Sequence, residues 1–215
     1  HMDVAEDIDW HQLLTSTPAI VPSSSNALLP LGAKAFKLIN HLYFRLSLKG
    51  RENIPANGPF IIAPNHESFL DAPMVTSGLS WDTIRNTYFY ATEEHFNTAF
   101  KRSVAHGSNV ILMQKSDLKS SIQYMAQALR AGKNLMIFPE GRRTNTGEMG
   151  DFKKTFAILA KELRVPIVPV RITGAFEALP RHKSFPRPSK VTVEYLPAVM
   201  PDVTKSYDEI AEQVK

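Results

Sequence analysis

A histidine and an aspartate five positions apart, His66 and Asp71, are of the residue types that transfer protons. They belong to the run Asn65-His66-Glu67-Ser68-Phe69-Leu70-Asp71, which directly follows a predicted strand over 60–63. On one helix, residues five apart point about 140° away from each other and could not meet. Across a strand-to-helix turn they can meet, and Asp71 before Ala72-Pro73 is typical of a helix start. The aspartate would then fix the histidine tautomer, and the free ring nitrogen could accept a proton from a hydroxyl or amine.

The spacing of this pair also fits a plainer interpretation. Asp71 could simply cap a helix, and His66 could be an ordinary surface histidine. A third possibility, metal-dependent hydrolysis by His66 with Glu67 or Asp71, has too few candidate ligands nearby.

A second charged cluster lies at the end of another predicted strand. It reads Phe138-Pro139-Glu140-Gly141-Arg142-Arg143-Thr144. Gly141 permits a tight backbone, and the two arginines offer forked donors that suit a phosphate. A basic loop without a ligand is the alternative interpretation.

Three patterns in order carry a family resemblance. Asn-His-x4-Asp, then Phe-Pro-Glu-Gly-x-Arg, then Val-Pro-Ile-Val-Pro-Val at 165–170 resemble the glycerophospholipid acyltransferase superfamily, which includes the 1-acylglycerol-3-phosphate acyltransferases. The resemblance covers roughly residues 48–175. It implies transfer of a fatty acyl group from an acyl thioester, either acyl-CoA or acyl-carrier protein, to the hydroxyl of a lysophospholipid.

The same resemblance assigns roles to the first motif. It implies that His66 is the general base on the acceptor hydroxyl and that Asp71 orients it. Asn65 is expected among the substrate-binding residues. No covalent acyl-enzyme is required, which agrees with a chain that contains no cysteine.

The acceptor site is expected in the second motif. Glu140 and Arg143 match the positions that hold the glycerol-phosphate acceptor in this family, and Gly141 shapes their loop. Two positions depart from the pattern and are still expected to bind substrate. Lys115 stands where an arginine is usual in the family, so the positive charge is kept but the two parallel donors of a guanidinium group are lost. Arg142 replaces a small hydroxylated residue, so a different headgroup, a glycolipid or an amine stays open as the acceptor.

Short apolar runs alternate with helical patterns from residue 59 onward, and these elements must position the motifs. Strands are predicted over 60–63, 87–91, 109–113, 134–138, 167–172 and 190–196, and helices around 96–104, 118–129 and 152–163. This alternation predicts an α/β fold with a mainly parallel sheet flanked by helices, and an N-terminal helical appendage. We expect an acyltransferase domain over 48–215 after a membrane-facing segment over 1–47.

A basic amphipathic helix is predicted over 31–48. Its cations share one arc: Lys34, Lys37, His41 and Arg45. Such a helix can lie on an anionic membrane surface, or it can pack on the domain with its lysines in water. No apolar run approaches the ~18–20 residues of a spanning helix. We therefore expect a peripheral membrane enzyme at the cytoplasmic face.

Residues 176–190 are rich in proline and cations and are predicted to form a basic loop. This loop could bind anionic lipid, the phosphates of coenzyme A or an acidic carrier protein. It could equally be a solvent-exposed loop without a ligand.

Composition excludes several function classes. The chain has 215 residues, 43% of them apolar and 21% charged, which argues against disorder. A net charge of +4 is too weak to predict a nucleic-acid partner. With no cysteine, a thiolate nucleophile and a cysteine-ligated metal are impossible. Dinucleotide and P-loop signatures are absent, so we expect no metal and no cofactor, with the acyl thioester as a substrate.

Two further expectations complete the sequence-based view. The chain opens with His1-Met2, which is typical of a cloning remnant, so it could be a piece of a larger multidomain protein. A catalytically silent lipid-binding module is the alternative to an enzyme.

Overall fold

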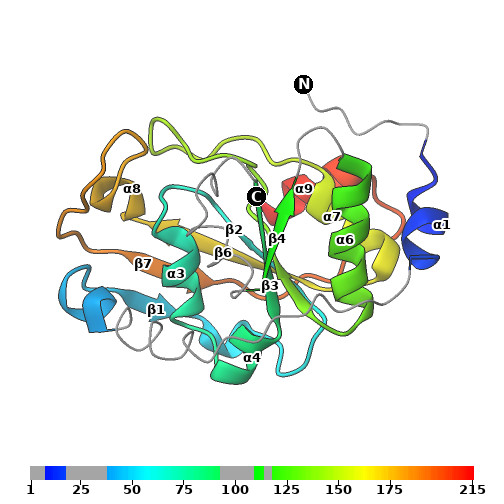
Figure 1. Cartoon of the computed structure of the whole chain (residues 1–215), viewed down its shortest axis with the longest axis horizontal. Coiled ribbons are helices and arrows are strands. Elements are labelled where there is room, and N and C mark those ends of the chain that lie inside the picture. The colour runs from blue at the N-terminus through cyan, green and yellow to red at the C-terminus, as the bar shows by residue number, and fades with distance from the viewer. Residues whose placement is uncertain (1–7, 18–37, 93–108, 114–117) are drawn as a thin grey trace.

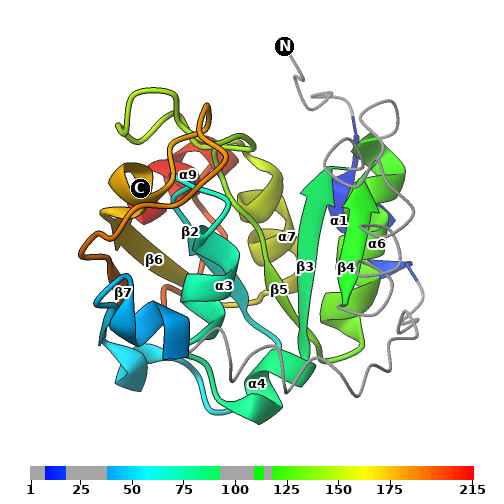
Figure 2. The ribbon, with the colours of Figure 1, turned by 60° about the vertical axis from the view of Figure 1, so that its left-hand side comes forward.

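A seven-stranded sheet forms the centre of the molecule, with the strand order β1-β7-β6-β2-β5-β3-β4 (Figures 1 and 2). The structure is a computed structural model, and it describes residues 8–17, 38–92, 109–113 and 118–215. Its strands are β1 (Ser47–Lys49), β2 (Ile61–Pro64), β3 (Thr87–Thr92), β4 (Val110–Met113), β5 (Asn134–Met136), β6 (Ile167–Thr173) and β7 (Thr192–Tyr195).

The five strands from β6 to β4 run parallel to one another, while β7 is antiparallel to β6 and parallel to β1. The predicted α/β fold with a mainly parallel sheet is therefore confirmed. Because β2 is the neighbour of both β5 and β6, the segments that leave these three strands emerge at the same edge of the sheet. Ligands of open α/β sheets bind at such an edge.

Helices cover both faces of the sheet. They are α1 (Trp10–Thr15), α3 (Asp71–Thr76), α4 (Trp81–Arg85), α6 (Leu118–Arg130), α7 (Thr155–Leu163), α8 (Ala175–Ala178) and α9 (Tyr207–Val214), with a 3₁₀ turn η1 (Arg51–Asn53). Figure 2 shows α6 and α7 on one side of the sheet and α3 on the other. None of these described helices combines the length and the apolar character needed to cross a bilayer.

The apolar core has two halves, one on each face of the sheet. Ile61 packs with α1, α6, α7 and α9, while its neighbour Ile62 packs with α3 and α8. Successive strand residues point to opposite faces, so a strand covered on both sides is apolar throughout. All four residues of β2 are buried. Full burial of each isoleucine stabilises the fold by about 1.5–3 kcal/mol.

The predicted helix over 31–48 is wrong at its C-terminal end. Residues 38–42 are helical, Arg45 has a positive φ of 43°, and the chain then enters β1. The reason is a long-range pairing: Val191 N–H donates to the Phe44 carbonyl, and Ser47 N–H donates to the Val191 carbonyl. Phe44 is only 2% exposed and belongs to the core. The first part of this prediction, 31–37, and the predicted helix around 96–104 lie outside the described residues.

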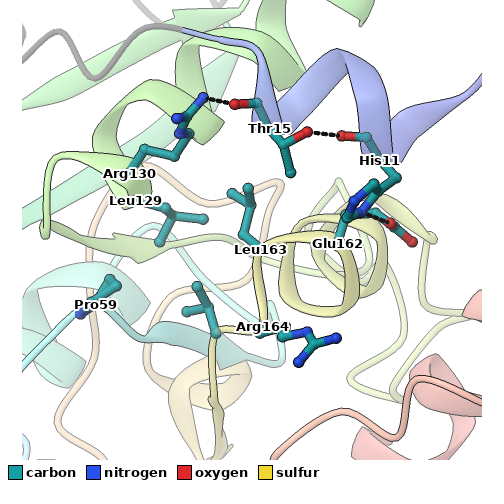
Figure 3. Close-up of a pocket in the computed structure, with 9 residues that line it drawn as sticks. His11, Thr15, Pro59, Leu129, Arg130, Glu162, Leu163 and Arg164 are labelled. Carbon is teal, nitrogen blue, oxygen red and sulfur yellow. Dashed lines mark hydrogen bonds and ion pairs between the residues drawn. The ribbon is translucent and has the colours of Figure 1, made fainter.

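A cavity of about 350 Å³ lies between α1 and α7 (Figure 3). Pro59 and Val165, which precede β2 and β6, line it, so it opens at the N-terminal edge of the parallel strands. Three of its charged or titratable side chains, those of His11, Glu162 and Arg130, already have protein partners. His11 Nδ1 lies 3.1 Å from Glu162, and Arg130 donates to three carbonyls at the end of α1.

Candidate active site

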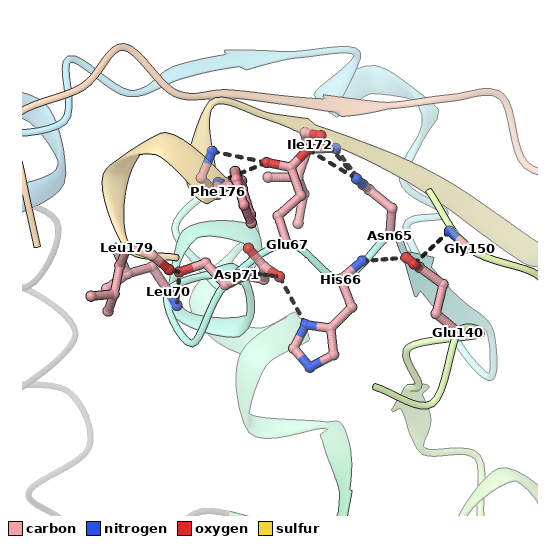
Figure 4. Close-up of polar contacts among 12 residues, drawn as sticks. Asn65, His66, Glu67, Leu70, Asp71, Glu140, Gly150, Ile172, Phe176 and Leu179 are labelled. Atoms are coloured by element: carbon pink, nitrogen blue, oxygen red, sulfur yellow. Dashed lines mark hydrogen bonds and ion pairs between the residues drawn. The ribbon is translucent and has the colours of Figure 1, made fainter. Parts of the chain in front are cut away.

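The turn between β2 and α3 brings the predicted histidine and aspartate together. His66 Nδ1 lies 2.8 Å from Asp71 Oδ2 (Figure 4). The same carboxylate oxygen accepts the Ser68 N–H at 2.7 Å, which closes the turn. Asp71 is the first residue of α3, and Leu70 holds the N-cap position, so Asp71 begins the helix and does not cap it. The Asp71 side chain is fully buried, and the His66 side chain is 19% exposed.

This pair has the electrostatics of a proton-transfer site. Burial raises the pKa of Asp71, and hydrogen bonds from the His66 ring and the Ser68 amide act in the opposite direction. The His66 ring stacks on Phe138, with centroids 4.0 Å apart. No described residue bonds the other ring nitrogen, Nε2. A neutral His66 that donates from Nδ1 to Asp71 therefore presents Nε2 as a proton acceptor.

The second motif holds the His66 backbone. Glu140 accepts the His66 N–H at 2.6 Å through Oε1 and the Gly150 N–H at 2.8 Å through Oε2. Thr144 N–H donates to the His66 carbonyl at 2.8 Å. Glu140 was predicted to contact the acceptor, and in the structure both of its carboxylate oxygens accept backbone N–H groups. Its observed position is that of a support for His66.

Side chains on either side of His66 bind the segment around the end of β6. Asn65 donates to the Ile172 carbonyl at 3.0 Å and accepts the Ile172 N–H at 2.6 Å. Glu67 accepts the N–H groups of Ala175 and Phe176, each at 3.0 Å. Burial raises the pKa of Glu67 to about 7. Asn65 was predicted to bind substrate. In the structure, both the nitrogen and the oxygen of its side-chain amide form hydrogen bonds within the protein.

Sequence reasoning missed several of these supporting residues. The sequence indicated Glu67 only as a possible metal ligand, and Phe138 only as the end of a predicted strand and the start of the second motif. Ser68 Oγ, which donates to the Leu179 carbonyl at 2.9 Å, was not considered. The groups that Glu67 and Ser68 bind around α8 lie more than one hundred residues away, so no spacing pattern could indicate these contacts. Phe138 did carry a signal, because it follows β5, which is the neighbour of β2.

A buried arginine from the second motif lies beside the pair. Arg143 is 8% exposed, and its Cζ lies 3.4 Å from the centroid of the Phe69 ring. Its Nη1 is buried and has no hydrogen-bond partner among the described residues. Burial and the nearby Arg181 lower the pKa of Arg143, whereas Asp71 acts in the opposite direction. Arginine stays charged in proteins, so the site contains a cation with a donor available for an anion.

The remaining predicted residues have different surroundings. Gly141 has a positive φ of 68°, and a Cβ on it would lie 2.8 Å from Lys153 Nζ, so the loop requires glycine or a local shift. Arg142 is exposed. Lys115 lies outside the described residues.

Comparison with known proteins agrees with this geometry. Residues 45–173, more than half of the chain, match the family model described as Acyltransferase. The chain is 26% identical over 143 residues to a chloroplastic 1-acyl-sn-glycerol-3-phosphate acyltransferase of Brassica napus, which covers 64% of the chain and 40% of the relative. It is 36% identical over 109 residues to a 1-acyl-sn-glycerol-3-phosphate acyltransferase of Limnanthes alba, covering 49% of the chain and 38% of the relative.

The chain thus spans about two fifths of the length of these curated relatives. A solved structure with a similar fold is that of the 1-acyl-sn-glycerophosphate acyltransferase PlsC from Thermotoga maritima. The TM-score is 0.70 at 24% identity, and the match covers 85% of this chain and 74% of that one.

Proposed function

This chain belongs to the acyltransferase family, and we propose that it transfers a fatty acyl group from an acyl thioester to the hydroxyl of a 1-acylglycerol-3-phosphate. One observation carries the proposal. His66 Nδ1 is bonded to the buried Asp71, and Nε2 has no partner among the described residues. Relatives named as 1-acyl-sn-glycerol-3-phosphate acyltransferases support the choice of acceptor.

The proposed mechanism is a direct transfer. His66 Nε2 takes the proton of the acceptor hydroxyl while the hydroxyl oxygen attacks the thioester carbonyl. The new C–O bond forms, the C–S bond breaks, and the leaving thiolate takes the proton back from the imidazolium. Asp71 stabilises that imidazolium and keeps the ring oriented, and the stacking of Phe138 limits its rotation.

The acceptor phosphate is proposed to bind next to this pair. The unpartnered Nη1 of Arg143 supports this proposal because a buried donor without a protein partner suits an anionic ligand. Asn65 and Glu140 are proposed to act on substrate through the loop that they hold. Arg142, exposed beside Arg143, is proposed to widen the cationic site toward the solvent.

The donor and the place of action are also proposals. The donor is acyl-CoA or acyl-carrier protein, and the enzyme works as a peripheral protein on the cytoplasmic face of a membrane. Exposed apolar side chains on residues 38–42 support membrane contact there. Leu38 is 61% exposed and Leu42 is 69% exposed.

The test is thiol release from a long-chain acyl-CoA with and without lysophosphatidate, repeated with acyl-carrier protein as the donor. We expect acceptor-dependent release in the wild type and a loss of about 10²–10⁴-fold in His66→Ala, because a general base contributes a factor of this size. His11→Ala, an exposed histidine at the opposite edge of the sheet, is the matched control and should remain active.

Full activity in folded His66→Ala would contradict the mechanism. A panel of headgroups on the same wild-type protein tests the acceptor. A clear preference for lysophosphatidylethanolamine over lysophosphatidate would contradict the proposed phosphomonoester.

A further inference from the structure

The loop between α8 and β7 combines an exposed aromatic ring with a cluster of cations. Phe185 is 84% exposed, more than any other large apolar side chain among the described residues. Residues 181–188 are all exposed. The cations and the histidine of the loop are Arg181, His182, Lys183, Arg187 and Lys190, and no acidic residue occurs between Glu177 and Glu194.

Isolated apolar side chains are common on protein surfaces, so the exposure of Phe185 needs a second observation. The second observation is a contact with a distant segment. Tyr43 Oη donates to the Pro186 carbonyl at 3.1 Å. Tyr43 adjoins the helical residues 38–42, whose exposed apolar side chains are Leu38, Ile39 and Leu42. Two segments more than 140 residues apart are therefore in contact, and each of them carries exposed apolar side chains.

The loop also begins at the active site. The Leu179 carbonyl accepts the Ser68 hydroxyl, within the turn that holds His66. Arg181 Nη1 donates to Asn145 Oδ1 at 3.3 Å, which connects the loop to the segment after Arg143. Phe185 lies only six residues after Leu179, which contacts the turn that holds His66. A membrane bound at Phe185 would therefore lie close to the active site along the chain.

We propose that the loop of residues 179–190 docks on an anionic lipid bilayer, with Phe185 inserted among the lipids and its cations against their headgroups. The inference rests on the proposed function only in that the acceptor is a lipid. Lys183 and Arg187 form no ion pair with any described acidic side chain, so their charges are available to anionic lipids. The phosphates of coenzyme A would use the cations and leave the apolar ring exposed, whereas a bilayer uses both.

The test is co-sedimentation of the whole chain with vesicles of phosphatidylcholine alone or with phosphatidylglycerol. We expect wild-type protein to prefer the anionic vesicles. Phe185→Ser should weaken that binding by about tenfold or more, because an apolar ring is no longer buried. The double variant Lys183→Glu, Arg187→Glu should weaken it by about a hundredfold at low salt and remove the preference for anionic vesicles.

Matched controls come from α6. Tyr124→Ser removes an aromatic side chain that is 53% exposed, and Lys119→Glu reverses an exposed charge, and both should bind vesicles as the wild type does. Turnover of a short-chain acceptor that stays monomeric in water should be unchanged in Phe185→Ser, since this residue is not part of the proposed catalytic machinery.

Vesicle binding by Phe185→Ser equal to that of the wild type overturns the proposal. So does a loop-charge variant that binds vesicles normally while its KM for acyl-CoA or acyl-carrier protein rises, which would assign the loop to the donor. If no acyl transfer occurs with any acceptor but vesicle binding still depends on Phe185, then the docking surface stands and the proposed function fails.

Discussion

The His66 side chain makes a hydrogen bond to Asp71, and its two peptide groups make further bonds to the second motif. His66 N–H binds Glu140, and the His66 carbonyl binds Thr144 N–H. Catalytic groups act best when their geometry is fixed before substrate arrives. The two motifs of the family therefore form one unit, in which the second motif holds the residue that the first supplies.

Replacement of Arg143 or Arg142 by lysine, one at a time, distinguishes the role of the buried arginine from that of the exposed one. Arg143→Lys should raise the KM for lysophosphatidate by about tenfold, because lysine keeps the charge but loses the fork and the stacking on Phe69. Arg142→Lys is the matched control and should change that KM by less than about twofold, since its side chain is exposed. Steady-state kinetics with a varied acceptor gives both values, and the reverse order of effects would contradict the assignment.

Glu67 makes the stability of the fold depend on pH. Burial raises its pKa from 4.5 to about 7, so the folded chain holds this proton more tightly than the unfolded chain. The contribution of Glu67 to stability is therefore greatest below pH 4.5 and falls as the pH rises toward 7 and above. Glu67→Gln keeps an acceptor for the N–H groups of Ala175 and Phe176 and removes the titration.

The free energy of unfolding of Glu67→Gln, relative to wild type, should therefore rise between pH 4.5 and pH 8, by no more than about 3 kcal/mol. Urea titrations of both proteins across this range give the difference. Parallel curves for wild type and variant would show that Glu67 does not titrate there.

Local spacing was sufficient to predict the contact between His66 and Asp71, because both residues belong to one turn. It was insufficient for Asn65, Glu67 and Glu140. These residues bind backbone groups that the topology brings from elsewhere, so their types alone gave no indication of a supporting role. A polar residue in a motif can therefore serve the site without facing the substrate.

At the scale of elements, the central strands were the easiest part to predict. β2 and β6 are covered on both faces, so each is a continuous apolar run bounded by turn residues. β1 was missed because its three residues are at the sheet edge and half exposed, and the cations before it suggested a helix. The pairing that makes Ser47–Lys49 a strand comes from β7, almost 150 residues away.

The junction of β6 and α8 tolerates less change at its glycine than the turn after α6 does. Gly174 has a φ of 88°, and a Cβ there would lie 2.2 Å from the backbone oxygen of Lys190. Gly132 has a similar φ of 76°, and a Cβ added there would have nothing within 4 Å. Substitution of Gly132 by alanine therefore measures only the free-energy cost of a positive φ in a residue with a side chain.

Gly132→Ala should lower the free energy of unfolding by about 1–2 kcal/mol, and Gly174→Ala should lower it further. Gly174→Ala should also reduce acyl transfer, since α8 supplies the N–H groups that bind Glu67. Equal stabilities of the two variants in denaturant titrations would mean that the backbone at Lys190 moves away easily.

At the scale of the whole molecule, α1 is part of the same packed body as the sheet. Leu14 is fully buried and belongs to the core half formed by α6, α7 and α9. Arg130 of α6 binds the last carbonyls of α1, so polar contacts hold the same interface. The described part of the N-terminal segment therefore contributes to the stability of the α/β core.

Leu14→Ala should lower the free energy of unfolding by about 2–5 kcal/mol, with a single cooperative transition. Leu42→Ala, which truncates a leucine that is 69% exposed, should change it by less than about 0.5 kcal/mol. Circular dichroism during urea unfolding reports both. An unaltered midpoint for Leu14→Ala would indicate that α1 detaches before the core unfolds.

The two bonds between the Asn65 side chain and Ile172 have a consequence for how the chain leaves the sheet. A peptide unit presents one N–H and one C=O to its neighbour, and the carboxamide of asparagine presents the same two groups. The β2–β6 ladder ends at Pro64 opposite Val170, and the Asn65 amide occupies the place of the next rung. The main chain is thereby free to turn away one residue early while the ladder continues through a side chain. His66 can lie outside the sheet because the Asn65 side chain makes the hydrogen bonds to β6 that a further main-chain residue of β2 would make.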